Sequence, residues 1–238
     1  MIRSGPSLQP ACGTTDIHML YLNDSTLFAN GKKLNPADMT WQDANPAARA
    51  GGIPCGTPLD VVAAVQWLQQ SDTPFRPPVA VLGPREASQE EKDTARALGK
   101  RLANLGLTVL CGGRQGVMEA VCRGVQEGNG ISVGLLPEDD WKSGNQFVSI
   151  PIATGIGIAR NALIARAAAC AVAVGGGLGT LSEIALSLQF GKRVFGVCDA
   201  PRVPGLRLCT NLDVLEQEIC LAVLQLPSGV LPLDDQSR

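Results

Sequence analysis

The stretch Cys170–Leu186, CAVAVGGGLGTLSEIAL, runs from five apolar residues through a glycine-rich turn into a segment with helical spacing. A short run that is apolar throughout is typical of a strand buried on both faces of a parallel sheet. Glycines after such a strand let the backbone approach an anion, and the first amides of the following helix point at it. The stretch therefore predicts a strand, a turn able to hold a phosphate group, and a helix.

The same alternation of strand and helix extends over residues 78–238. Strands are expected at 78–83, 107–113, 131–137, 147–154, 169–176 and 193–199, with helical patterns between them and after the last one. Ser88 and Glu91 have the spacing of a capping box at the start of one helix, and Gly106 suits its end. Apolar strands alternating with helices predict an α/β fold, a doubly wound, Rossmann-like parallel sheet.

Residues 1–77 show no such alternation and predict a small α+β extension followed by a linker. Asn30-Gly31 between partly alternating residues indicates a β-hairpin. Thr57 is expected to cap a helix that has Pro58 as its first residue. One hypothesis for this region is a module that docks the rest of the chain onto a partner protein.

The bulk composition indicates a globular protein rather than a disordered one, with 45% apolar and 18% charged residues among 238. A net charge of −2 gives no broad basic field, so no nucleic-acid partner is expected. The apolar runs are too short to span a bilayer, and the first residues lack a secretory pattern, so we expect a cytoplasmic protein without a membrane partner. Eight cysteines without a CxxC pair, together with the single histidine His18, predict free buried thiols and no metal site.

Glycine-rich turns follow the first, second and fifth expected strands, and ligands of such sheets bind beyond the carboxyl ends of the strands. We therefore expect a phosphate-bearing ligand at these turns. The glycines concerned are Gly83, Gly112, Gly113, Gly176, Gly177 and Gly179. Thr180 adds a hydroxyl donor, and Arg114 stands where a polar edge of the ligand could lie. Neither GxGxxG nor GxxxxGK[ST] occurs, so dinucleotide-binding and P-loop functions are not expected.

The segment GGGLGTLSE resembles the PGGxGTxxE signature of the Lonely Guy (LOG) proteins, and GIARNALIARAAACAVAVGGG before it resembles their arginine-bearing helix and strand. LOG enzymes cleave the N-glycosidic bond of nucleoside 5′-monophosphates. The resemblance implies Arg160 and Glu183 as the catalytic residues of such a phosphoribohydrolase.

Three departures from the LOG pattern are similar to a sister branch, the molybdenum-cofactor carrier-like proteins. Gly175 replaces the proline of the signature, Asn161 rather than lysine follows the arginine, and the second turn reads GGRQGVMEA. This similarity covers about residues 78–198. It implies molybdenum cofactor as a carried ligand and no cleavage of that ligand. The resemblance to LOG proteins, which are commonly oligomeric, implies a homo-oligomer, and Asn161 could hydrogen-bond a sugar or pterin edge. A shared fold does not choose between carrier and hydrolase.

The two residues implied to be catalytic also have structural interpretations. Thr180 and Glu183 fit a capping box, S/T-x-x-E, in which the carboxylate only stabilises the start of a helix. Arg160 stands in an otherwise small and apolar helix, where it could serve as half of a structural ion pair. Both interpretations stay open beside the functional one.

Overall fold

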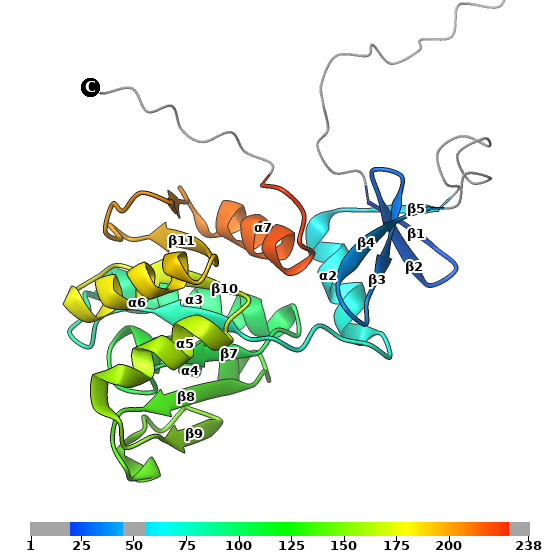
Figure 1. Ribbon diagram of the computed structural model, residues 1–238. Helices are drawn as coiled ribbons and strands as arrows, with labels where there is room; N and C mark the ends of the chain where they lie inside the picture. The colour runs from blue at the N-terminus through cyan, green and yellow to red at the C-terminus, as the bar shows by residue number, and fades with distance from the viewer. Residues whose placement is uncertain (1–19, 45–55, 229–238) are drawn as a thin grey trace, which may run out of the picture.

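The computed structural model describes residues 20–44 and 56–228 and contains two sheets (Figure 1). A five-stranded antiparallel sheet has the order β4-β3-β2-β1-β5, and a seven-stranded parallel sheet has the order β12-β11-β10-β6-β7-β8-β9. The expected doubly wound α/β fold with a small N-terminal extension is confirmed.

The strands of the parallel sheet are apolar because helices cover them. Their bounds are β6 (Val79–Leu82), β7 (Val109–Cys111), β8 (Ser132–Leu136), β9 (Ile150–Ala153), β10 (Cys170–Val174), β11 (Arg193–Val197) and β12 (Leu206–Leu208). The sequence patterns predicted all of these except β12, a three-residue edge strand that is too short to give a periodic signal.

Two layers of helices enclose the parallel sheet. On one face lie α3 (Gln89–Asn104), α4 (Val117–Glu127) and α7 (Leu212–Val223), and on the other α5 (Arg160–Ala167) and α6 (Leu178–Gln189) (Figure 1). Short 3-10 turns, η1 (Trp141–Ser143) and η2 (Gly157–Ala159), stand on either side of β9 along the chain. Ile164 of α5 and Ile184 of α6 are fully buried against the sheet, which fixes the starts of both helices beside the strand ends.

The predicted capping box at the start of α3 is confirmed. The Glu91 amide donates to Ser88 Oγ at 3.2 Å, and the Ser88 amide donates to Glu91 Oε2 at 2.7 Å. Gly106 follows the end of the helix with a φ of +76°, a conformation that glycine adopts without strain.

The antiparallel sheet contains the hairpin predicted at Asn30 and Gly31. It consists of β1 (Leu20–Asn23), β2 (Thr26–Ala29), β3 (Lys32–Asn35), β4 (Thr40–Asp43) and β5 (Thr57–Leu59). Asn30 and Gly31, with φ of +50° and +75°, form the predicted hairpin turn between β2 and β3.

The predicted start of the first helix is wrong. Thr57 and Pro58 belong to β5, which pairs with β1, and proline is tolerated there because β5 is an edge strand. Helix α2 (Val61–Gln70) begins after Asp60, whose carboxylate accepts a hydrogen bond from the Ala63 amide at 2.7 Å.

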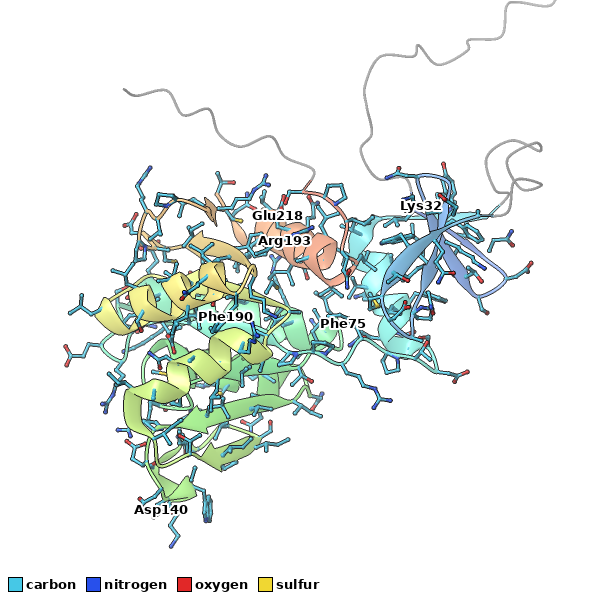
Figure 2. The ribbon with its side chains drawn as sticks, viewed as in Figure 1. Lys32, Phe75, Asp140, Phe190, Arg193 and Glu218 are labelled. Carbon is cyan, nitrogen blue, oxygen red and sulfur yellow. The ribbon has the colours of Figure 1, made fainter. Side chains whose placement is uncertain are left out.

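The antiparallel sheet is joined to the rest of the molecule through α2 and α7, which contact each other (Figure 1). Trp41 Nε1 of β4 donates to the Leu224 carbonyl, at the end of α7, at 2.7 Å. In Figure 2, Lys32 of the antiparallel sheet and Asp140, just before η1, lie at opposite ends of the molecule.

The six cysteines among the described residues are all free thiols. Five of them are buried, as predicted, and Cys198 is half-buried. Cys12, Cys55 and His18 lie outside the described residues. Within residues 20–44 and 56–228, no helix combines the length and apolarity needed to cross a bilayer.

Candidate functional site

A cavity of about 430 Å³ opens at the carboxyl ends of the parallel strands. Its walls come from the turns after β6, β7, β8 and β10 and from the starts of α5 and α6. Its lining includes three arginines and three glutamates, namely Arg85, Arg114, Arg160, Glu86, Glu138 and Glu183. Of the predicted ligand-binding residues, those in the lining are Gly83, Arg114, Asn161, Gly177, Gly179 and Thr180. The volume is within the range of small-molecule sites.

Arg160 and Glu183 meet in the wall of this cavity. Arg160 is the first residue of α5, Glu183 lies in the second turn of α6, and Arg160 Nη1 is 2.9 Å from Glu183 Oε1. Both residues are buried, with exposed fractions of 9% and 7%. The ion pair foreseen for Arg160 is therefore present, but a buried pair of this kind is weak grounds for a purely stabilising role.

The capping interpretation of Glu183 is wrong. Helix α6 starts at Leu178, after Gly177, so Thr180 lies inside the first turn rather than at the cap, and Glu183 bonds Arg160 instead. The glycines before Leu178 let the chain turn into the helix three residues earlier than a threonine cap would require. The carboxylate is thereby left in the cavity wall.

Burial raises the pKa of the Glu183 carboxyl group from 4.5 to about 7, although the charge and hydrogen bond of Arg160 act in the opposite direction. A carboxyl group with a pKa near neutrality can donate or accept a proton under ordinary conditions. Such shifts are found at functional sites more often than elsewhere.

Unpaired polar atoms lie in the residues that line the cavity. Thr180 is 2% exposed, and its hydroxyl has no hydrogen-bond partner. Nε of Arg160 and Nε of Arg114 are also buried without a hydrogen-bond partner. Of the four such buried side-chain atoms among the described residues, only Arg193 Nη1 belongs to a residue outside the cavity lining. Buried donors without partners are unfavourable, so a ligand that supplies acceptors would satisfy them.

The glycines of the expected site fall into two groups. A Cβ atom at Gly177 or Gly179 would meet no other atom within 4 Å, so the backbone at the start of α6 faces open space. A Cβ at Gly112 would overlap the Arg160 guanidinium, and one at Gly113 would come within 2.6 Å of Leu136 Cδ2. The first group leaves room for a ligand, whereas the second makes room for the protein's own side chains.

The other predicted glycines also serve close packing. A Cβ at Gly83 would overlap the Val117 side chain, and one at Gly176 would lie 2.5 Å from Pro201 Cδ. Gly83 nevertheless lines the cavity through its backbone.

Arg114 is paired with Glu138, a lining residue that the sequence analysis missed. Burial lowers the pKa of the Arg114 guanidinium, and the charges of Arg85 and Arg160 lower it further. Glu138 follows β8 by two residues, and its place after an apolar strand was the signal that could have identified it.

Asn145 is a second residue that the sequence analysis missed. Its Nδ2 donates to the carbonyls of Gly113 at 3.1 Å and Arg114 at 3.0 Å, and its amide donates to Gly113 at 2.9 Å. The residue is buried and holds the turn after β7 in place. No local pattern in the sequence relates it to that turn.

Asn161 Nδ2 donates to Ser182 Oγ at 3.0 Å and so links α5 to α6 beside the cavity. Arg166 is not among the residues that line the cavity, and its guanidinium lies 4.8 Å from the centre of the Phe190 ring, which Figure 2 labels.

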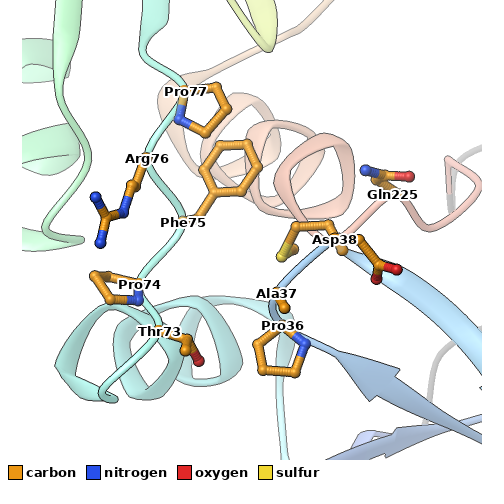
Figure 3. A pocket seen from close by; sticks show the side chains of 10 residues that line it. Pro36, Ala37, Asp38, Thr73, Pro74, Phe75, Arg76, Pro77 and Gln225 are labelled. Carbon is orange, nitrogen blue, oxygen red and sulfur yellow. The ribbon is translucent and has the colours of Figure 1, made fainter.

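A second cavity, of about 400 Å³, lies between the antiparallel sheet, the linker before β6 and the residue Gln225 (Figure 3). Prolines and Phe75 form much of its wall, with Asp38 and Arg76 as its charged residues. It contains none of the residues predicted for ligand binding.

Comparisons with known proteins agree with this geometry. A family model described as the SLOG cluster4 family matches residues 76–217. An uncharacterized protein of Archaeoglobus fulgidus is 37% identical over 130 residues, which are 55% of this chain and 85% of that protein.

Two solved structures show the same likeness. The molybdenum cofactor binding protein of Rippkaea orientalis is 34% identical, with a TM-score of 0.50 over 63% of this chain and 85% of that one. The molybdenum cofactor carrier protein of Chlamydomonas reinhardtii is 29% identical, with a TM-score of 0.58 over 62% of this chain and 98% of that one. The resemblance to the LOG-like superfamily, on its molybdenum-cofactor carrier branch, is confirmed, and the chain belongs to the SLOG cluster4 family.

Proposed function

We propose that this protein binds a phosphate-bearing, nucleotide- or pterin-like ligand in the cavity at the strand ends and carries it without cleaving it. The observation that carries the proposal is the start of α6, where the backbone at Gly177 and Gly179 faces open space and the buried Thr180 hydroxyl lacks a partner. The free amides and positive dipole end of a helix attract phosphate. Arg160 adds a cation beside them.

The residues present fit molybdenum cofactor as the carried ligand. The start of α6 supplies donors for its phosphate, and the opposite wall supplies the polar residues Arg114 and Glu138 for a pterin ring. Both similar solved proteins are described as binding or carrying this cofactor. Bound here, the cofactor would be cargo, and this chain would only hold and orient it.

A binding titration tests the proposal. Calorimetry with purified molybdenum cofactor, and with nucleoside and pterin monophosphates, should give micromolar or tighter affinity, and Thr180→Val should weaken it about ten-fold through loss of one hydrogen bond. Thr73→Val, in the second cavity, is the matched control and should leave the affinity unchanged. Absence of binding for every compound offered would refute the proposal.

The Arg160–Glu183 pair supports hydrolysis as the second candidate function. A carboxyl group with a pKa of about 7 could orient water or hold a sugar hydroxyl while positive charge develops at the anomeric carbon. Incubation with AMP and GMP, followed by an assay for free base, distinguishes the functions. Base release that Glu183→Gln abolishes, while binding persists, would establish the hydrolase. Intact monophosphate after long incubation supports the carrier.

We also propose that residues 78–238 form the ligand-binding domain and residues 1–77 an attached extension. The Trp41 hydrogen bond to Leu224 and the contact of α2 with α7 support an extension that stabilises the larger domain. Trp41→Phe, which removes the donor together with one ring of the indole packed against the core, should lower the free energy of unfolding by at least about 1 kcal/mol without changing ligand affinity. Loss of affinity together with unchanged stability would contradict this role.

A further inference from the structure

The cavity is longer than a phosphate site requires. In the order β10-β6-β7-β8, the ends of β10 and β8 are separated by three strand spacings, roughly 14 Å in all. The start of α6 follows β10, and Glu138 follows β8 (Figure 1). The Arg160–Glu183 pair bridges the space between, since Arg160 also lies against Gly112 after β7. A ligand held by its phosphate at α6 therefore extends towards Arg114 and Glu138.

That far end presents a donor and an acceptor side by side. Arg114 Nη1 pairs with one carboxylate oxygen of Glu138, and the other oxygen accepts from Ser143 Oγ at 3.0 Å. A guanidinium has five N–H donors and a carboxylate about four acceptor sites, so these contacts use only part of either group. Nε of Arg114 is buried without a partner. Both residues keep unused hydrogen-bonding capacity.

The pair is also held in position before any ligand arrives. Asn145 fixes the backbone of Gly113 and Arg114 through its amide group. Ser143 Oγ lies within hydrogen-bonding distance of both the Glu138 carboxylate, at 3.0 Å, and the Asp140 carbonyl, at 2.8 Å, and its single proton is shared between them. The loop is tied back where the Gly155 amide donates to the Glu138 carbonyl at 2.9 Å. Met118 and Pro137 add apolar surface to the same part of the cavity. Groups fixed in this way lose little conformational entropy on binding.

We propose that this end of the cavity selects a heterocycle with a 2-amino-4-oxo pyrimidine edge, the edge that guanine and pterin share. Arg114 donates to the ring carbonyl oxygen, and Glu138 accepts from the adjacent ring N–H and from the exocyclic amine. Adenine presents an amine where the carbonyl is needed and a bare nitrogen where the N–H is needed, so it leaves both protein groups unmatched. The proposal rests on the proposed function, because the phosphate at α6 sets the direction of the ligand.

A series of monophosphates tests the selectivity on the unaltered protein. Affinities for GMP, IMP, AMP and a pterin monophosphate are measured by calorimetry at one pH and one salt concentration. GMP or the pterin monophosphate should bind at least about ten-fold more tightly than AMP, the effect of one hydrogen bond to a charged group. IMP keeps the carbonyl and the ring N–H but lacks the amine, so it should fall between them.

The variant Glu138→Gln tests the residue. It should reduce the preference for GMP over AMP to less than about three-fold, while AMP affinity changes little. Glu90→Gln, the same substitution at an exposed position in the first turn of α3, is the matched control and should keep the full preference. Thermal unfolding of both variants checks that they fold. If Glu138→Gln does not fold, the series of monophosphates on the unaltered protein still tests the selectivity.

The outcomes separate this inference from the function on which it rests. Equal affinity for GMP, pterin monophosphate and AMP overturns the ring selectivity and leaves the phosphate site intact. A preference that survives Glu138→Gln overturns the role of Glu138. Failure of every monophosphate to bind overturns both proposals. Tight binding of GMP alone identifies a guanine nucleotide, and tight binding of the pterin compound alone identifies a pterin, and either result supports the shared edge.

Discussion

The glycine-rich turns after β7 and β10 look alike in the sequence, but the surroundings of their glycines differ. In the turn after β7, the space beside Gly112, Gly113 and Gly116 is filled by Arg160, Leu136 and the backbone of the turn after β6. In the turn after β10, Gly177 and Gly179 have nothing within 4 Å of a Cβ position. The glycines of the first turn make room for the protein's own atoms. After β10, Gly175 and Gly176 also pack closely, and only Gly177 and Gly179 leave a surface open for binding. A glycine-rich motif alone does not say which of the two it is.

The largest effect is expected from Gly116→Ala. Gly116 has a φ of +74°, and a Cβ there would overlap the carbonyl oxygens of Pro84 and Arg85. Strained backbone and overlap with main-chain atoms together should lower the free energy of unfolding by about 3 kcal/mol. Urea denaturation measures this, and a stable Gly116→Ala protein would remove the distinction between the two turns.

Gly179→Ala should leave the stability nearly unchanged but weaken ligand binding. Gly179 lies in the first turn of α6, where alanine is favoured over glycine, so the stability should stay within about 1 kcal/mol of the unaltered protein. The added methyl group occupies space that the proposed ligand needs, and the affinity for a nucleoside or pterin monophosphate should fall at least ten-fold. Denaturation and calorimetry on the same sample give both values. Unchanged affinity would show that the open backbone is not a phosphate site.

Leu178, between the two open glycines, tests a further property of the second turn. Its side chain is 88% exposed and that of Ile158 is 87% exposed, and the contacting elements η2, α5 and α6, with the residue just before η2, expose further apolar side chains, Ile156, Leu163 and Leu181. An apolar patch of this kind marks a surface that contacts another molecule. We propose that the chain forms a homo-oligomer through this face. Leu178→Ser should shift the molar mass measured by light scattering towards that of the monomer. A monomeric unaltered protein would contradict the proposal.

The last test concerns the pH dependence of stability. Because the pKa of Glu183 rises from 4.5 to about 7 on folding, the folded protein binds this proton more tightly than the unfolded chain does. The associated stability is present below about pH 4.5 and is lost as the pH rises towards 7. Glu183→Gln should lack this part of the slope, which the difference between the two urea-denaturation profiles reveals. Parallel profiles would show that folding does not raise the pKa of the Glu183 carboxyl group.

Much of the fold could be predicted because burial on both faces of a parallel sheet imposes apolar runs that are visible residue by residue. The same reasoning failed at Thr57 and Pro58, where a local capping signal competes with pairing to β1, a strand more than thirty residues away. It failed again at Thr180, because the three preceding glycines allow an earlier helix start. At Thr57 the local pattern suited two structures and pairing with a distant strand chose between them, whereas at Thr180 a second local feature, the glycine run, decided where the helix begins.

The sequence by itself determined the layered α/β architecture, the strand ends at which the cavity opens, and the family. Only the tertiary structure decided that Arg160 meets Glu183, that Glu138 faces Arg114, and that Gly177 and Gly179 rather than Gly112 and Gly113 are open. Hydrophobic periodicity is a local property, which each segment carries in its own residues. Pairing of charges and empty space depend on residues that are distant in the chain and become neighbours only when the strands align.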